Sequence, residues 1–391
     1  MQQQLSKVTE LLQGQPMFKI LAEIKERERK GQDFVHFEIG DPDFSTPAKI
    51  IDAACSALHN GFTHYSESLG DYDFREAFAE YNLKERGFKP DVSQVLASPG
   101  ANMLIYYAVC CLVNPGEDVI VQDPCFPTYL SVFNFCGVNP IMVPLREENG
   151  FRLNPDDLRK AITPKTRLII VNSPHNPTGA VMKESELREI ANIALENGIY
   201  LYLDEIYAKM NYGEIPNFSP SIIDKCKDRL IVATGFSKAF AMTGWRLGVC
   251  IAPSEVIAKM GLLLQTTSSC VSSFIQKAGI AAITQEHPEV KKMIDTYKAR
   301  RNILVDGLNS IEGISCLLPA GSFYVFPNIK DTGMTSHDFA FNLLRNAGVG
   351  VCPGDDFGAS GAGYIRLCYA TSTERIYEGI KRIKDFVEGD K

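Results

Sequence analysis

The middle of the chain alternates short apolar runs with segments of helical periodicity, and no other feature restricts the possible folds as strongly. Arg167 to Val171 (RLIIV) is rich in β-branched residues, and Tyr200 to Leu203 (YLYL) is apolar on both faces. Residues 183–197 between them show helical periodicity, with Glu in the first turn. Strands buried on both faces are typical of parallel sheets, because crossover helices cover both sides. The alternation therefore predicts an α/β layer architecture with a largely parallel sheet over roughly residues 50–285.

The same pattern predicts the remaining strands and helices of this sheet. We expect strands at 94–97, 118–122, 140–143, 230–234 and 247–251. We expect helices at 101–113 and 128–135, each between two of these strands.

The two ends of the chain have a different organisation. Residues 16–30 are expected to form one charged amphipathic helix. Beyond about residue 288 we expect a long charged helix, strands at 314–317 and 323–327, a helix at 336–347, a strand at 364–368 and a helix at 372–388. Both ends would build one smaller α+β domain. The predicted division is an N-terminal arm and part of the small domain at 1–49, a large domain at 50–287 and the rest of the small domain at 288–391.

Charge and composition argue against several classes of protein. The formal net charge is −7 without long basic runs, which disfavours nucleic acid as a partner. The longest purely apolar run, 103–113, is too short for the roughly 20 residues that span a membrane, and the N-terminus lacks a signal-peptide pattern. The 11 cysteines are scattered without a C-x-x-C pair, which favours a reducing cytoplasm. The six histidines form no H-E-x-x-H motif, so we expect no metal.

Polar residues follow several predicted strands, at the edge of the sheet where α/β proteins bind ligands. Gly100-Ala101-Asn102 begins a helix whose exposed N–H groups suit a phosphate, although a plain tight turn is the alternative. It matches neither the ATP-binding nor the dinucleotide-binding glycine motif. Asp204 follows YLYL, where it is either a helix cap or a buried carboxylate that needs a partner. The turn 172–179 (NSPHNPTG) follows another strand and could be merely a loop.

The segment 235–248 (GFSKAFAMTGWRLG) contributes the decisive residues. Lys238 is followed almost wholly by apolar residues, which predicts a desolvated, partly neutral and nucleophilic amine. Ser237 precedes it directly, and Arg246 lies eight residues further on. A lone buried lysine is usually a paired structural residue. Together with the strand-end carboxylate and the glycine helix start, however, this segment supplies a Schiff-base amine, phosphate donors and a pyridinium counter-ion.

These motifs, with several others, occur in the order found in one enzyme family. They include GDPDFSTP (40–47), THYSESLG (63–70), NPGEDVIV (114–121), NSPHNPTGAV (172–181), DEIY (204–207), SKAFAMTGWRLG (237–248), PAGSFYVFP (319–327) and CPGDDFG…GYIRLCYA (352–370). From about Val35 to the end, the chain resembles the class I aminotransferases, which are fold-type I enzymes that use pyridoxal 5′-phosphate. The resemblance implies a large domain with a mostly parallel sheet covered by helices, and a smaller α+β domain.

The resemblance also implies which residues hold the cofactor ring. Lys238 would form a Schiff base with the cofactor and then move the substrate proton. Asp204 would pair with the pyridine nitrogen and keep it protonated. Tyr207 and Asn176 would hydrogen-bond the 3′ oxygen of the ring, and Phe126 would stack on the ring face.

A phosphate site and a substrate site follow from the same resemblance. The phosphate donors would be the helix start and two nearby side chains: Gly100, Ala101, Asn102, Ser237 and Arg246. Tyr65 would reach the phosphate of a neighbouring subunit, which implies a homodimer. Arg366 would grip the substrate α-carboxylate with its guanidinium fork, with Gly40 and Asn176 in contact.

Acidic residues depart from the family pattern at two places. Glu38 lies two residues before Gly40, and strand alternation predicts that both point the same way. Glu67 stands where the family often has Pro or a small residue. These carboxylates are either a solvated rim or part of a pocket that attracts a cationic substrate. No extra arginine for a second substrate carboxylate is evident, so we expect a monocarboxylic amino acid, and we expect His175 to be a loop residue.

The resemblance implies a transaminase with a ping-pong mechanism, whose substrates are an L-amino acid and a 2-oxo acid. The closest alternative is another reaction on the same scaffold, such as elimination, decarboxylation or oxygen-dependent oxidation, because fold and cofactor do not determine the reaction. A cofactor-binding regulator of transcription belongs to a different class. It would need a DNA-binding segment before the enzyme motifs, and these begin by residue 40. A purely structural role is disfavoured because every chemical position is filled.

Overall fold

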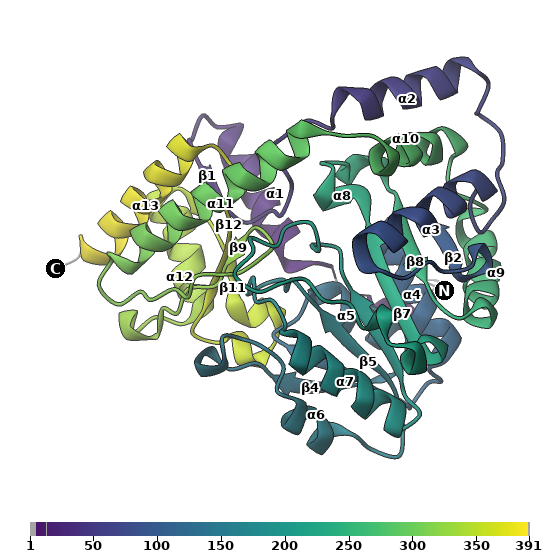
Figure 1. Cartoon of the computed structure of the whole chain (residues 1–391). Helices are drawn as coiled ribbons and strands as arrows, with labels where there is room; N and C mark the ends of the chain where they lie inside the picture. The colour runs from purple at the N-terminus through teal and green to yellow at the C-terminus, as the bar shows by residue number, and fades with distance from the viewer. Residues whose placement is uncertain (1–4, 13, 390–391) are drawn as a thin grey trace, which may run out of the picture.

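A seven-stranded sheet forms the centre of the molecule (Figure 1). The computed structural model describes residues 5–12 and 14–389. The strand order is β2-β8-β7-β6-β5-β3-β4. The strands are β2 (Val95–Ser98), β3 (Asp118–Asp123), β4 (Asn139–Pro144), β5 (Thr166–Asn172), β6 (Tyr200–Asp204), β7 (Leu230–Gly235) and β8 (Gly248–Ile251). Strand β8 is antiparallel to both its neighbours and the other pairs are parallel, so the prediction of a mostly parallel sheet is confirmed.

Helices cover both faces of this sheet, because successive strand residues supply apolar side chains to opposite sides. In β5, Ile169 and Val171 belong to one apolar cluster, whereas Leu168 and Ile170 belong to the other. The first face is covered by α3 (Tyr72–Arg86), α6 (Pro155–Ala161), α7 (Glu184–Glu196) and α10 (Ser273–Thr284), and α2 (Ala48–His59) packs on α10. The second face is covered by α4 (Ala101–Leu112), α5 (Pro127–Cys136) and α9 (Ser254–Ser268).

The register of the central strands brings three carboxyl ends together. Asn172 of β5 pairs with Asp204 of β6, and Asp204 pairs with Ala233 of β7. Strand β7 then continues directly into the short helix α8 (Phe236–Ala239). Residues that follow β5, β6 and β7 therefore share one edge of the sheet.

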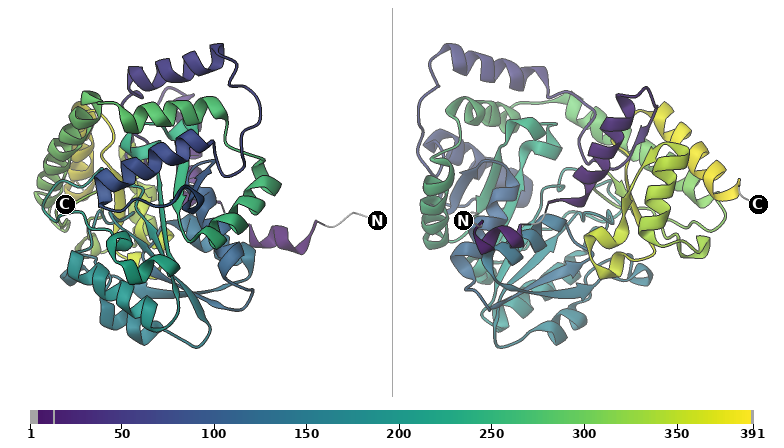
Figure 2. Two further views of the ribbon diagram at one scale, coloured as in Figure 1. Left: turned by 45° about the vertical axis from the view of Figure 1, so that its right-hand side comes forward. Right: turned by 180° about the vertical axis from the view of Figure 1, so that it is seen from behind.

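Both ends of the chain build a second, smaller unit beside the sheet. Strand β1 (Val35–His36) pairs in parallel with β10 (Val349–Gly350). Strands β11 (Cys352–Pro353), β12 (Ile365–Cys368) and β9 (Tyr324–Val325) form an antiparallel sheet. The helices that pack on these strands are α1 (Pro16–Glu28), α11 (Pro288–Asn309), α12 (Ser336–Asn342) and α13 (Thr373–Glu388). In Figure 1 and in the right view of Figure 2, the purple helix α1 lies beside the yellow-green C-terminal elements. The expected α+β unit is thus present, and its boundaries at 49/50 and 287/288 stay a prediction.

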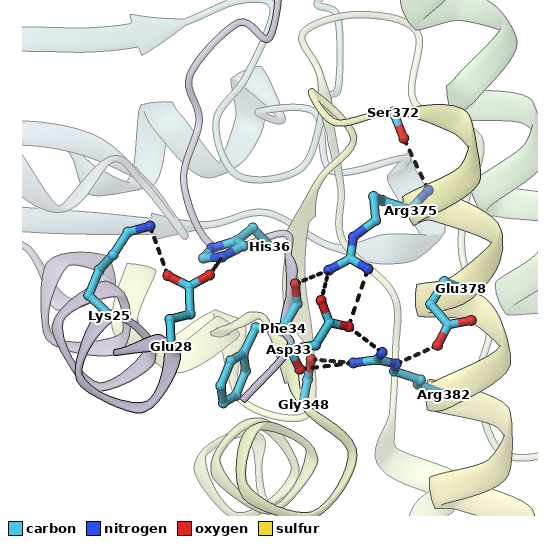
Figure 3. Close-up of polar contacts among 10 residues, drawn as sticks. All are labelled: Lys25, Glu28, Asp33, Phe34, His36, Gly348, Ser372, Arg375, Glu378 and Arg382. Atoms are coloured by element: carbon cyan, nitrogen blue, oxygen red, sulfur yellow. Dashed lines mark hydrogen bonds and ion pairs between the residues drawn. The ribbon is translucent and has the colours of Figure 1, made fainter. Parts of the chain in front are cut away.

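The polar contacts in Figure 3 tie the N-terminal segment to this unit. Asp33 accepts hydrogen bonds from Arg375 at 2.8 Å and from Arg382 at 2.6 Å, both on α13. Arg375 also donates to the carbonyl of Phe34. These contacts lower the pKa of Asp33 to about 2, because hydrogen bonds from two guanidinium groups favour the carboxylate.

Two elements differ from the expectation. The expected strand at 314–317 is absent, and Ser315 makes only an isolated bridge with Asn328. The reason is local: the Asn309 side chain bonds both the N–H and the carbonyl of Cys316 and thereby removes them from a ladder. The expected helix at 336–347 divides, because α12 ends at Asn342 and a π-helical turn, Leu343–Ala347, follows.

Two further observations concern the ranges 5–12 and 14–389 alone. No helix in them is long and apolar enough to cross a membrane. No group of three His, Cys, Asp or Glu side chains in them is arranged to hold a metal ion.

Candidate active site

A cavity of about 400 Å³ opens where the carboxyl ends of β5, β6 and β7 meet the smaller unit. It brings together residues that are far apart in the sequence. Most of the predicted site residues line it: Gly40, Ala101, Asn102, Phe126, Asn176, Asp204, Tyr207, Ser237, Lys238, Arg246 and Arg366. The motif-based prediction and the geometry therefore point to the same place.

Lys238 projects into this cavity from α8, one turn after the end of β7. Its Nζ donates a hydrogen bond of 2.5 Å to the carbonyl of Gly40 and lies 5.3 Å from the centre of the Phe323 ring. Burial lowers the pKa of this amine to about 8. A substantial fraction of Lys238 is therefore neutral slightly above neutral pH, as a nucleophilic amine requires.

Asp204 ends β6 as a partly buried carboxylate at the cavity wall. It accepts a hydrogen bond of 2.5 Å from the Tyr129 hydroxyl and one of 3.2 Å from the N–H of Ile206. Burial raises its pKa. No ion pair to Asp204 occurs among the residues that the structure describes. A buried carboxylate without a cation is costly, so this position suits a positively charged ligand group.

The residue after Asp204 points to the other face of the sheet. Glu205 accepts a hydrogen bond of 2.7 Å from Arg86 of α3, and this ion pair is largely buried. The Thr234 hydroxyl also donates to the carbonyl of Glu205, at 3.3 Å. These contacts fix the end of β6 on the face away from the cavity, while Asp204 lines the cavity.

The start of α4 and Arg246 form a cationic end of the cavity. Gly100 caps the helix with φ +82°, and a Cβ there would lie 2.3 Å from Nη2 of Arg246. A Cβ at Gly248 would lie 2.6 Å from the backbone nitrogen of Ala101. Glycine at both positions therefore lets the guanidinium and strand β8 approach the helix start. Free N–H groups, the helix dipole and a guanidinium together favour a phosphate.

Arg366 reaches the cavity from the smaller unit, on β12, and is only 1% exposed. It donates to the carbonyl of Glu38 at 2.5 Å and to the side-chain oxygen of Asn176 at 3.2 Å. Its Nε has no partner in the part of the chain that is described, and no carboxylate there pairs with it. The guanidinium lies against the Tyr324 and Phe357 rings. A buried guanidinium with free donor capacity fits a ligand carboxylate.

Tyr207 and Gly40 also line the cavity. The hydroxyls of Tyr207 and Tyr324 share a hydrogen bond of 2.9 Å. Burial raises the pKa of Tyr207 well above its usual value, so the phenol stays protonated and can donate. A Cβ at Gly40 would lie 1.9 Å from the Tyr324 hydroxyl, so glycine is needed for this close approach.

Sequence reasoning missed several residues that line the cavity. Tyr129 and Asn172 both serve Asp204: the first bonds its carboxylate, and the second donates from its side-chain amide to its carbonyl at 2.9 Å. Tyr324, in the segment PAGSFYVFP (319–327), lines the cavity and bonds Tyr207, and its motif alone predicts no role for it. Met17 and Phe18 of α1 also line the cavity, and only the fold reveals them, because they precede every motif.

Two predicted residues lie outside the cavity lining. Gly100 is next to it, as the cap of α4. Tyr65 is 88% exposed and borders a separate surface hollow with Phe62 and Cys270. Within one chain, the structure does not bring Tyr65 to the other site residues. His175 is buried in its loop, shares a 2.8 Å hydrogen bond with Thr178 and does not line the cavity; burial lowers its pKa to about 3.

Glu38 and Glu67, the two acidic residues that depart from the family pattern, do not line the cavity. Glu38 is fully buried and shares a hydrogen bond of 2.8 Å with Nδ1 of His36, so it is not a solvated rim. Strand β1 ends at His36, and the alternation that would have aligned Glu38 with Gly40 does not continue. Glu67 is exposed and pairs with Arg75 at 2.6 Å.

Comparison with known proteins agrees with this geometry. Residues 32–383 match the family model of aminotransferase class I and II. The chain is 41% identical to an aspartate aminotransferase of Pyrococcus horikoshii, over 95% of each chain. It is 39% identical to aromatic-amino-acid aminotransferase 2 of Thermococcus litoralis, over 92% of this chain and 93% of that one.

A solved structure shows the same fold. The crystal structure of an aromatic aminotransferase from Pyrococcus horikoshii superposes with a TM-score of 0.90 at 38% identity, over 94% of this chain and 99% of that one. The fold class is therefore the fold-type I architecture expected from the motifs. On its sequence, its fold and the residues gathered in the cavity, the chain belongs to the class I and II aminotransferases, a family of enzymes that depend on pyridoxal phosphate.

Proposed function

We propose that the cavity binds pyridoxal 5′-phosphate and that the protein transfers the amino group of an L-amino acid to a 2-oxo acid in two half-reactions. One observation carries the proposal: a desolvated lysine amine and a partly buried carboxylate without a cationic partner line the same cavity. An amine in its neutral form and a carboxylate that needs a cation are what this cofactor requires of a protein.

The donor set fits the two charged ends of the cofactor. The helix start at Ala101 and Asn102, with Arg246 and Ser237, offers donors to a phosphate. Asp204, braced by Tyr129, offers an acceptor to a protonated pyridine nitrogen. Phe126 lines the same cavity, and its aromatic ring would stack on the cofactor ring.

When bound, pyridoxal phosphate supplies an aldehyde that reacts with amines and a ring that accepts electron density from the substrate Cα. Lys238 would hold it through Nζ and, once displaced by a substrate amine, would carry the proton from the substrate Cα. The lowered pKa of about 8 keeps part of the Lys238 population unprotonated, so that Nζ can accept this proton. Asp204 would hold a proton on the pyridine nitrogen, while Tyr207 and Asn176 orient the ring through its 3′ oxygen.

Arg366 would bind the substrate α-carboxylate, with Asn176 fixing one side of the guanidinium. The substrate we propose is monocarboxylic. The cations among the described residues that line the cavity are Lys238, Arg246 and Arg366, and each already has a role. Relatives of similar identity are named for aspartate and for aromatic amino acids, and a panel of amino donors that includes both kinds tests the preference.

We also propose a homodimer in which Tyr65 reaches the phosphate site of the neighbouring subunit. Support comes from its exposure and from the N-terminal arm, which projects from the body in the left view of Figure 2. Leu11 and Leu12 on this arm are largely exposed, as apolar residues at a subunit contact are in an isolated chain. The cytoplasmic location expected from the cysteines stays a prediction.

The first test concerns the cofactor itself. Purified protein loaded with pyridoxal phosphate should be yellow, and borohydride should fix the label on one peptide that contains Lys238. A label on another lysine would overturn the assignment, because Lys238 is the one lysine among the described residues that lines the cavity with Asp204.

The second test concerns the reaction. Loaded enzyme given an amino acid alone should release one equivalent of 2-oxo acid per site and then stop until a second 2-oxo acid is added. Release of ammonia or carbon dioxide, or uptake of oxygen, without an added 2-oxo acid would show another reaction on this scaffold.

A further inference from the structure

Two free cysteines are in contact between the two helices that reach the cavity from the second face of the sheet. Cys110 lies near the end of α4 and Cys136 is the last residue of α5. Their Sγ atoms are 3.6 Å apart, in hydrogen-bond contact. Within residues 5–12 and 14–389, no second pair of cysteine sulfurs is in such contact.

We propose that Cys110 and Cys136 form a redox site, at which a small-molecule disulfide reversibly converts the two thiols into an intramolecular disulfide. Both sulfurs are free in the structure, and Cys110 is exposed. Bond formation shortens the Sγ–Sγ separation from 3.6 Å to about 2.05 Å, which side-chain rotation at a partly exposed site can supply.

The surroundings distinguish the roles of the two thiols. Hydrogen bonds from Cys136 and Tyr106 lower the pKa of Cys110 to about 7, despite the opposing effect of burial. The pKa of Cys136 is raised, first by its hydrogen bond to Cys110 and then by burial. Cys110 is therefore the attacking thiolate, and Cys136 is the resolving thiol that follows. Burial raises the pKa of the adjacent Cys111, so it is a poor competitor.

The exchange balances in two steps. The Cys110 thiolate bonds to one sulfur of the small disulfide, whose S–S bond breaks and releases the first small thiol. The Cys136 thiolate then bonds to Cys110 Sγ and displaces the second small thiol. The two protein thiols lose two electrons, the small disulfide gains them, and the two thiol protons end on the released thiols.

The position of the pair gives oxidation a structural consequence. Helix α4 begins at Ala101 and α5 begins beside Phe126, and both residues line the cavity. A disulfide near the far ends of these helices would fasten the two segments that carry the proposed phosphate and ring contacts. The proposal is independent of the transaminase assignment, because the thiol chemistry needs neither cofactor nor substrate.

The test is disulfide mapping of the full-length protein, equilibrated in mixtures of oxidised and reduced glutathione. We expect a peptide pair linked through Cys110 and Cys136, two mass units lighter than the sum of the reduced peptides, which dithiothreitol separates. The melting temperature of the wild type should rise on oxidation, and this rise should vanish in Cys136→Ser, which should instead retain glutathione on Cys110.

Cys111→Ser is the matched control, because it removes the neighbouring thiol and leaves the pair intact. It should link Cys110 to Cys136 as the wild type does. Stable glutathione adducts on wild-type Cys110 without the internal link would overturn the proposal. So would links between Cys110 residues of two chains, or an equal yield of links through Cys55, which is also exposed.

Discussion

Substitution of Asp204 should affect the reaction rate without lowering the stability of the fold. Its partly buried carboxylate accepts a hydrogen bond from the Tyr129 hydroxyl and has no cation from the described chain. Asp204→Asn should therefore leave the cofactor-free protein as stable as the wild type or more so, because it removes a partly buried charge. The same change should lower kcat/KM by about 10- to 150-fold or more, the worth of one charge-assisted contact.

The measurements are thermal unfolding of the cofactor-free protein and steady-state kinetics of the loaded one. A large loss of stability would mean that Asp204 is a structural residue. Near-normal kcat/KM would mean that no cationic group of the cofactor depends on it.

Arg366 should act on every substrate alike. Arg366→Ala should raise KM and lower kcat/KM by about 10- to 150-fold for all amino acids tested, because the α-carboxylate is common to them. Arg366→Lys keeps the charge but loses the bidentate fork, so its kcat/KM should lie between those of the wild type and Arg366→Ala. The affinity of Arg366→Ala for an unreactive monocarboxylate should fall by a similar factor. A defect confined to one amino acid would instead place Arg366 at the substrate side chain.

Single residues show where sequence reasoning succeeds and where it ends. That Lys238, Asp204 and Arg366 would line one cavity was predictable, because each stands in a motif whose chemistry restricts the residue type. Tyr129 as the partner of Asp204 was not, because a hydrogen bond across 75 residues depends on how α5 meets β6. Glu38 was misjudged because the two-residue strand β1 is too short for alternation to carry forward.

Among the elements, the contact between the N-terminal segment and α13 should depend on pH. Asp33 is held ionised by Arg375 and Arg382, with its pKa lowered to about 2 against about 3.9 in an unfolded chain. A depressed pKa stabilises the fold above the unfolded value, and this stability is lost as pH falls through the folded value. Asp33 is largely exposed, so its contribution is about 1 kcal/mol or less.

Asp33→Asn should thus reduce the free energy of unfolding near neutral pH, and its difference from the wild type should shrink from about pH 4 toward about pH 2. Urea unfolding at several pH values measures this. Glu378→Gln, which removes another partner of Arg382, is the control and should cost less, since it leaves the Asp33 contacts in place. A constant difference across this pH range would contradict the assignment.

The elements themselves were largely predictable. Continuous apolar runs mark buried strands such as β5 and β6, whose length and composition leave few alternatives. The prediction of a strand at 314–317 was wrong because the Asn309 side chain bonds the backbone groups that a strand would use. Such competition arises only when the end of α11 is folded beside the segment.

At the scale of the whole molecule, a shared site predicts complementation between subunits. A Lys238→Ala chain and a Tyr65→Phe chain are each expected to be impaired. In a mixed dimer, however, one site receives Lys238 from one chain and Tyr65 from the other. Activity should therefore recover to a fraction of the wild-type value in purified heterodimers. No recovery would show that Tyr65 serves its own chain or no site at all.

The pairing of both chain ends has a consequence for synthesis. The Glu38 carbonyl accepts a contact from Cys352, 314 residues later, and at roughly 5–20 residues per second the ribosome needs roughly 15 to 60 s to make that stretch. Val35 and Phe37, fully buried in the finished molecule, have no partner strand during this interval. Each nascent chain therefore exposes an apolar N-terminal segment throughout its elongation, and a chaperone that binds nascent chains would find its target there.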